Sequence, residues 1–234
     1  MERGMSITKL IKVFGDSILK GVQLNPETCR YYVNNTIDIE MLNKKYSLII
    51  ENYSKFGATI TRGYKLLQQH LRAGFTCYAV VMDFGGNDSD FNWDAIAKNP
   101  EKEHFPHTPL DIFIETYHKM ISLLQQKGVQ PIITTLPPLE PQRFFDWFCR
   151  NLNKEKILNW LGGSNTIYRY HESYSRAIEL IAAEANVPLV DLRGAFLRNR
   201  RIEHLLCCDG IHPNTAGQKV ITSAFADFAA SRVG

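Results

Sequence analysis

Five short apolar runs alternate with longer amphipathic stretches along this chain, and this alternation restricts the possible folds more than any other feature. The runs, rich in Val and Ile, span residues 10–14, 46–51, 77–84, 129–136 and 187–192. Such runs are typical of strands that are covered on both faces. The amphipathic stretches predict helices over residues 62–73, 109–127, 167–185 and 215–231. Strands that alternate with helices are joined by right-handed crossovers, so we predict a three-layer α/β/α sandwich with about five parallel strands.

The chain of 234 residues suits a single α/β domain over residues 1–234. Two polar stretches that carry aromatic residues interrupt the alternation, at about 88–108 and 137–163, and the second is expected to contain one or two short helices. Each stretch begins just after a predicted strand. Both insertions should therefore emerge at the carboxyl edge of the sheet, where open α/β sheets bind their ligands.

Composition and charge argue against several classes of protein. The net charge is +3, and the one basic cluster, Arg198, Arg200 and Arg201, is mixed with polar and acidic residues. We therefore expect a solvated turn or helix face and no nucleic-acid partner. The first residues lack the apolar run of a signal peptide, and no segment is long enough to insert into a membrane. The five cysteines show no CxxC spacing, which favours reduced thiols in a cytoplasmic protein.

The first stretch that could carry chemistry is Gly15-Asp16-Ser17-Ile18, directly after the first predicted strand. At a strand-to-helix turn, Asp16 or Ser17 could cap the next helix by accepting hydrogen bonds from its free N–H groups. The same turn would expose the Ser17 hydroxyl at the sheet edge, near a helix N-terminus that favours a developing oxyanion. By itself this stretch leaves both interpretations open, and capping is the commoner of the two.

The second stretch, Asp209-Gly210-Ile211-His212-Pro213-Asn214, lies just before the last predicted helix. A carboxylate three residues before an imidazole can accept the Nδ1 proton, which leaves Nε2 free to take a proton from a hydroxyl. The alternative is an ordinary turn in which Asp209 makes a local hydrogen bond and His212 lies on the surface. In isolation the two interpretations are evenly balanced.

Two further stretches follow predicted strands and could supply hydrogen-bond donors. In Gly85-Gly86-Asn87-Asp88 the Asn87 amide could donate to an oxyanion, although a Gly-Asn turn after a strand is common. In residues 52–59, Gly57 could present an unhindered backbone N–H, although such a glycine more often only makes a turn. Taken together, the four stretches supply a nucleophile, a base, an orienting acid and three oxyanion donors, the set that acyl transfer needs.

In this order the four stretches resemble the SGNH hydrolases, also called GDSL esterases and lipases, from residue 11 to about residue 221. The Ser, Gly, Asn and His of the family fall on Ser17, Gly57, Asn87 and His212, and Asp209 matches the acid three residues before the histidine. Gly63 lies near Gly57, but the pattern N-x-x-x-x-G-A-T favours Gly57. Ile18 replaces the Leu of the G-D-S-L signature. No G-x-S-x-G elbow occurs, which argues against the ordinary α/β-hydrolase fold.

The resemblance implies a flavodoxin-like fold, a covalent acyl-enzyme, and neither metal nor organic cofactor. Ser17 would attack the ester carbonyl, His212 would accept its proton, and Asp209 would hold the imidazole. The backbone N–H groups of Ser17 and Gly57 and the side chain of Asn87 would hold the oxyanion.

The substrate is less constrained by the sequence than the chemistry. We expect a small-molecule ester with a short acyl chain, acetyl being the simplest, on a carbohydrate or similar polar alcohol, because the insertions mix aromatic with polar residues. Most of those aromatic residues are expected to pack the insertions onto the sheet. A lysophospholipase or thioesterase is the nearest alternative, and a non-catalytic module that binds a nucleotide or phosphate is the alternative from another class. Asp83 could point into the site, whereas His104, His107 and His118 are expected at the surface rather than on a metal.

Overall fold

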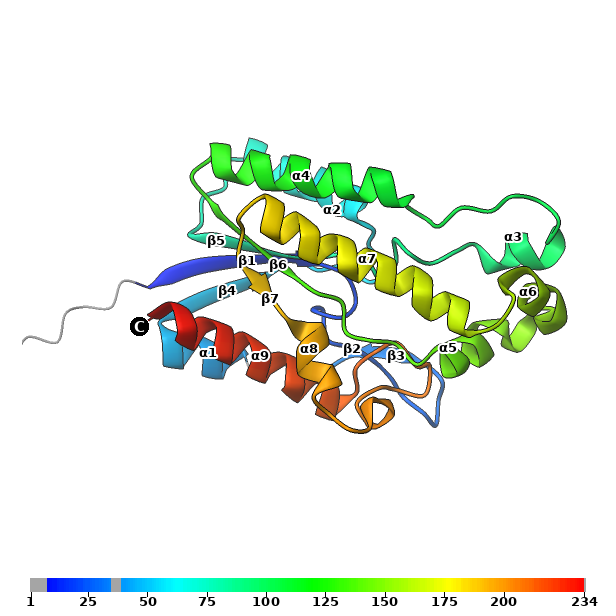
Figure 1. The fold of residues 1–234 in the computed structure, drawn as a ribbon. Coiled ribbons are helices and arrows are strands. Elements are labelled where there is room, and N and C mark those ends of the chain that lie inside the picture. The colour runs from blue at the N-terminus through cyan, green and yellow to red at the C-terminus, as the bar shows by residue number, and fades with distance from the viewer. Residues whose placement is uncertain (1–7, 35–38, 234) are drawn as a thin grey trace, which may run out of the picture.

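The computed structural model describes residues 8–34 and 39–233 and confirms the predicted three-layer α/β sandwich (Figure 1). Residues 1–7, on which part of the expectation about a signal segment rests, lie outside the described residues. The main sheet has five parallel strands in the order β4-β1-β5-β6-β7. They are β1 (Lys9–Gly15), β4 (Leu48–Asn52), β5 (Ala79–Asp83), β6 (Gln130–Thr134) and β7 (Leu189–Val190).

Helices cover both faces of this sheet (Figure 1). One layer consists of α2 (Ile60–Arg72), α4 (Leu110–Gln126) and α7 (Asn165–Glu184). The other consists of α1 (Ile39–Tyr46), α8 (Leu192–Leu197) and α9 (Thr215–Val233). Each layer encloses its own apolar core against the sheet, so the strands are buried on both sides, as their unbroken apolar sequences require.

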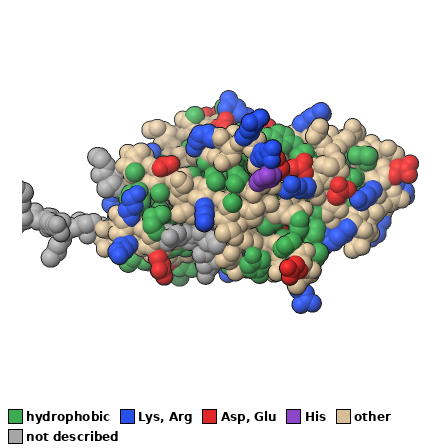
Figure 2. Space-filling model, turned by 90° about the horizontal axis from the view of Figure 1, so that it is seen from below, with side chains coloured by type: hydrophobic (Ala, Val, Ile, Leu, Met, Phe, Trp, Pro, Cys, Tyr) green, Lys and Arg blue, Asp and Glu red, His purple; other side chains and the backbone are tan. Residues whose placement is uncertain are grey.

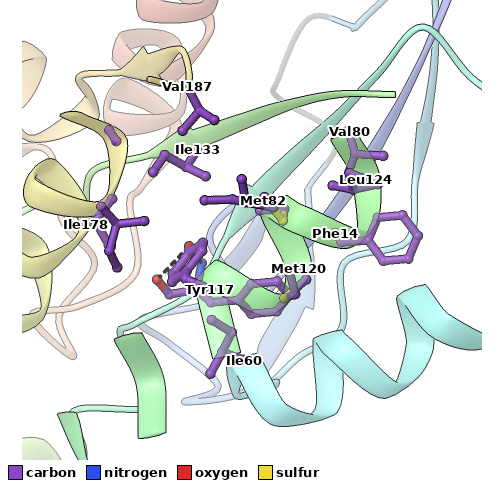
Figure 3. Packing of buried hydrophobic residues seen from close by; sticks show 14 of the residues in the cluster. Phe14, Ile60, Val80, Met82, Tyr117, Met120, Leu124, Ile133, Ile178 and Val187 are labelled. Carbon is purple, nitrogen blue, oxygen red and sulfur yellow. Dashed lines mark hydrogen bonds between the residues drawn. The ribbon is translucent and has the colours of Figure 1, made fainter. Parts of the chain in front are cut away.

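Figure 3 shows the larger of these two cores, in which Phe14 and Met82 of the sheet meet Ile60 and Met120 of the helices. The hydroxyl of the fully buried Tyr117 accepts a hydrogen bond from the Phe84 amide (3.2 Å) and lies 3.3 Å from the Phe84 carbonyl oxygen, to which it can donate. A buried phenol needs such a partner, and here the partner is the backbone directly after β5. The core thus anchors the start of the Gly85–Asn87 turn.

The two insertions lie at the carboxyl end of the sheet, as predicted (Figure 1). The first contains α3 (Trp93–Lys98). The second contains α5 (Pro141–Phe148) and α6 (Lys154–Leu161), joined by the short helix η1 (Cys149–Asn151). Most of their aromatic residues pack together in a third apolar cluster, which joins the insertions to each other and contains no residue of the sheet strands, so the expected packing onto the sheet is wrong. Phe105 is outside this cluster, with 63% of its surface exposed. A further short helix, η2 (Ile202–His204), precedes the Asp209 loop.

Several boundaries differ from the sequence prediction. The strand predicted to begin at residue 46 begins at Leu48, because α1 continues to Tyr46 and Ser47 then turns the chain with φ +52°. The last strand has only two residues, because Asp191 caps α8 by accepting a hydrogen bond from the Gly194 amide (2.7 Å). In both places local turn chemistry overrides the apolar run.

The sequence prediction missed several elements altogether, among them the helices α1 and α8 and an antiparallel hairpin of β2 (Val22–Leu24) and β3 (Tyr31–Val33). Each strand has three residues, which is too short for an alternation of apolar and polar side chains to be recognised. Among the described helices, none is both long and apolar enough to cross a lipid bilayer.

Candidate active site

Ser17 lies in a tight turn that follows β1. The turn is closed by hydrogen bonds from the Lys20 amide to the Asp16 carbonyl (3.2 Å) and from the Val22 amide to the Ser17 carbonyl (3.0 Å). The prediction of a helix after Ser17 is therefore wrong, because the chain turns back at once into β2. Asp16 still caps locally, since its Oδ1 accepts a hydrogen bond from the Ile18 amide at 2.8 Å. No helix begins at Ser17.

The loop before α9 brings His212 to Ser17. Nε2 of His212 is 2.9 Å from Oγ of Ser17, and Nδ1 is 2.7 Å from Oδ2 of Asp209. The other oxygen of Asp209 accepts hydrogen bonds from the amides of Ile211 and His212, both at 3.1 Å. A hydroxyl, an imidazole and a carboxylate thus form one continuous line of hydrogen bonds, the geometry that activates a serine.

Glycine at position 210 is required by the path of this loop. Its φ is +76°, and a Cβ atom there would lie 2.7 Å from the Glu140 carbonyl oxygen and 2.8 Å from the Phe144 amide nitrogen. Both the left-handed backbone and the close approach of α5 exclude a larger residue. The turn therefore fits against the second insertion.

Ser17, His212 and Asp209 are buried, and burial affects the pKa of the Asp209 carboxyl group. Asp209 has no exposed surface, and Ser17 and His212 are 6% and 3% exposed. Burial alone would raise the pKa of Asp209, but the hydrogen bond and the charge of His212 outweigh it and lower that pKa. Asp209 is therefore ionised at neutral pH and is placed to stabilise an imidazolium ion.

Hydrogen-bond donors line the cavity beside Ser17. Asn87 and Gly57 line the same cavity as the serine, and Nδ2 of Asn87 donates a hydrogen bond to Oδ2 of Asp16 at 2.9 Å. Within the described residues, neither the Ser17 amide nor the Gly57 amide donates a backbone hydrogen bond. Both N–H groups are thus free to meet a ligand.

Gly57 and Gly63 occupy different environments. Gly57 has φ +67° and open space where a Cβ atom would be. Gly63 lies in α2, and a Cβ atom there would be 2.1 Å from the Phe84 ring. Gly63 is thus explained by helix packing, whereas Gly57 borders the cavity.

Three buried carboxyl groups lie under the site. Burial raises the pKa of Asp16 well above its usual range, and the neighbouring Asp83 raises it further. Burial also raises the pKa of Asp83 to about 6, although the Thr134 hydroxyl donates to it at 2.6 Å. Asp88 likewise has its pKa raised to about 6 by burial, while its carboxylate accepts from the Ile60 amide at the start of α2. As expected, Asp83 borders the cavity.

No sequence pattern predicted the two aromatic rings that flank His212. Tyr31, from the hairpin, has its ring centroid 5.0 Å from that of His212. Phe56, next to Gly57, stacks at 5.9 Å with an interplanar angle of 8°. Only the pairing of β2 with β3 brings Tyr31 here, so the missed hairpin also concealed this contact.

The cavity that contains Ser17 and His212 has a volume of about 170 Å³. The insertions contribute a mostly apolar part of its lining, with Phe91, Trp93 and Phe144 among the residues. Polar side chains, Ser89, Asp90 and His171, interrupt this apolar lining. Burial, and the charge of Arg193, lower the pKa of His171 to about 3, so this imidazole is neutral.

The remaining polar clusters take no part in the site. His107 is exposed and His104 and His118 are partly exposed, and no group of three potential metal ligands occurs within residues 8–34 and 39–233. Arg198, Arg200 and Arg201 are exposed, and basic and acidic side chains are interspersed on the face shown in Figure 2.

Comparisons with known proteins agree with this architecture. The family model described as GDSL-like Lipase/Acylhydrolase matches residues 13–220, and the chain belongs to that family. Membership supports an ester-hydrolysing enzyme. No curated protein sequence matches the chain significantly.

Solved structures share the fold at low sequence identity. A lipase/acylhydrolase from Enterococcus faecalis is 18% identical, with a TM-score of 0.67 and 96% of each chain covered. A catalytic mutant of an acetylxylan esterase from Geobacillus stearothermophilus, in which a serine is replaced by alanine, gives the same values. A second catalytic mutant of that esterase, in which a histidine is replaced by alanine, is 20% identical, with a TM-score of 0.66 and 96% of each chain covered.

Proposed function

We propose that this protein is a serine esterase that hydrolyses a carboxylic ester through an acyl-enzyme. The observation that carries the proposal is the line of hydrogen bonds from Ser17 through His212 to Asp209, at 2.9 and 2.7 Å. The acetylxylan esterase of the same fold supports it, because substitution of a serine or of a histidine gave its catalytic mutants.

In the proposed mechanism His212 takes the Ser17 proton as the oxygen attacks the ester carbonyl. Asp209 holds the imidazole in the tautomer with its proton on Nδ1 and stabilises the cation that forms. The negative charge on the carbonyl oxygen is met by the Ser17 and Gly57 amides and by Nδ2 of Asn87. His212 then returns the proton to the leaving alcohol, and a water molecule activated by the same nitrogen releases the acid.

The size of the cavity favours a short acyl group such as acetyl. Pockets for drug-sized ligands measure roughly 300–1,000 Å³, and this one measures about 170 Å³. A long acyl chain would need more enclosed apolar volume than that. We therefore propose a short-chain ester of a carbohydrate-like or other small polar alcohol in preference to the substrate of a lysophospholipase or a long-chain thioesterase.

Covalent labelling tests the proposed nucleophile. A fluorophosphonate probe should label the native protein on Ser17, and the Ser17→Ala variant should neither bind the probe nor hydrolyse p-nitrophenyl acetate. Equal labelling of the variant and the native protein would refute the role of Ser17. With p-nitrophenyl esters of increasing chain length, kcat/KM should fall beyond short acyl groups, and a preference for long chains would refute the proposed acyl specificity.

A further inference from the structure

Three aromatic side chains from separate segments gather at the mouth of the candidate site. Tyr31 comes from β3, Phe56 from the loop after β4, and Trp147 from α5. The ring centroid of Tyr31 is 5.3 Å from that of Phe56 and 6.2 Å from that of Trp147. We refer to these three residues as the aromatic rim.

Two members of the rim contact both the cavity and solvent. Tyr31 and Phe56 both line the cavity that contains Ser17, yet 38% and 49% of their surfaces are exposed. Exposed aromatic groups that border a concave site are typical of ligand-binding surfaces. A ligand bound at Ser17 would therefore reach these rings.

The reaction geometry determines which half of the ester meets the rim. His212 must return its proton to the leaving oxygen, so that oxygen lies within hydrogen-bonding distance of Nε2. In the proposed mechanism the carbonyl oxygen of the ester points away from this nitrogen, toward the Ser17 and Gly57 amides and Nδ2 of Asn87. Because Tyr31 and Phe56 flank the imidazole ring itself, the part of the substrate next to them is the alcohol.

We propose that the aromatic rim is the subsite for the alcohol half of the ester and that this alcohol is a sugar ring; the inference rests on the esterase function proposed above. A sugar ring presents C–H groups on its faces and hydroxyl groups along its edges. Aromatic faces bind the C–H groups, and charged or polar side chains bind the hydroxyl groups.

The surroundings of the rim supply both kinds of group. The Arg150 guanidinium lies 3.9 Å from the centroid of the Trp147 ring, and the exposed Arg62 donates a hydrogen bond to the Gly57 carbonyl at 3.3 Å. These two cations can donate to hydroxyl groups at the ring edge. A long alkyl alcohol would instead favour an enclosed apolar channel, whereas the rim is open to solvent.

Competition among three acetate esters tests the subsite, because the acyl group is then constant. We expect the native enzyme to prefer 6-O-acetylglucose to ethyl acetate and to cyclohexyl acetate, measured as kcat/KM. Tyr31→Ala and Phe56→Ala should each reduce the preference for 6-O-acetylglucose over ethyl acetate by roughly three- to tenfold, mainly through KM. Tyr31→Phe, which keeps the ring, should retain the preference.

Tyr78→Ala is the matched control, since Tyr78 is an exposed tyrosine that does not line this cavity, and it should leave the preference unchanged. The sugar subsite would be overturned if the rim variants lost kcat/KM equally on 6-O-acetylglucose and ethyl acetate. It would also be overturned if the native enzyme preferred cyclohexyl acetate. If the fluorophosphonate still labels Ser17 in that case, the subsite alone is wrong. If Ser17 is not labelled and no ester is cleaved, the proposed esterase function itself fails.

Discussion

Asp16 uses both of its carboxylate oxygens on groups of the candidate site. Oδ1 accepts from the amide that follows Ser17, and Oδ2 accepts from Nδ2 of Asn87. An asparagine in place of Asp16 would have only one side-chain oxygen, so it could accept only one of these two hydrogen bonds. Asp16 is therefore a positioning residue for Asn87 in the proposed oxyanion hole.

Steady-state kinetics of three variants test this role. Asn87→Ala should lower kcat by roughly 10²–10³-fold, the usual effect of losing one oxyanion donor. Asp16→Asn should lower kcat in the same direction but less, with KM little changed. The double variant should be no slower than Asn87→Ala alone, because both changes remove one interaction. Additive losses would show that Asp16 acts independently of Asn87.

At the scale of an element, α2 packs closely enough on the end of β5 to require a glycine. Alanine normally stabilises a helix by about 1 kcal/mol relative to glycine, but a Cβ atom at Gly63 would overlap the Phe84 ring at 2.1 Å. Overpacking costs about 1–3 kcal/mol. After the helix gain is subtracted, a net loss of up to about 2 kcal/mol remains, so we expect Gly63→Ala to lower the melting temperature by up to roughly 8 °C. Thermal unfolding followed by circular dichroism measures this, and a raised melting temperature would contradict the packing argument.

Elements also differ in how far the sequence reveals them. The strands around Phe14 and Met82 are buried on both faces, so their apolar runs were sufficient to predict β1 and β5. The hairpin that carries Tyr31 is stabilised by contacts with distant parts of the chain, such as the hydrogen bond from the Leu24 amide to Sγ of Cys207 (3.4 Å). Local sequence carries no signal for such contacts. The aromatic rim could therefore not be predicted.

At the scale of the whole molecule, buried carboxyl groups make stability depend on pH. The pKa of Asp83 is about 6 in the folded protein because of burial, against roughly 3.9 in an unfolded chain. Between these values the folded state holds a proton that the unfolded state has lost. The contribution of Asp83 to stability is therefore greatest below about pH 4 and falls as pH rises through about 6.

The Asp83→Asn variant, which is neutral at every pH, tests this linkage. Its melting temperature relative to the native protein should rise between about pH 4 and pH 7, because only the native protein then ionises a buried group. Asp227→Asn, on the exposed face of α9, is a control whose difference from the native protein should stay nearly constant. A constant difference for Asp83→Asn as well would show that Asp83 does not titrate in this range.

The sequence by itself determined the sheet, the chemistry-bearing stretches and their order along the chain. It did so because strand burial and turn composition are local properties, and because the carboxyl ends of parallel strands meet at one edge. Only the tertiary structure decided that Ser17 sits in a turn without a helix, and that Gly63 packs on Phe84 while Gly57 borders the cavity. It also decided that Tyr31 and Phe56 flank His212. These features depend on contacts between segments distant in the sequence, which no local pattern specifies.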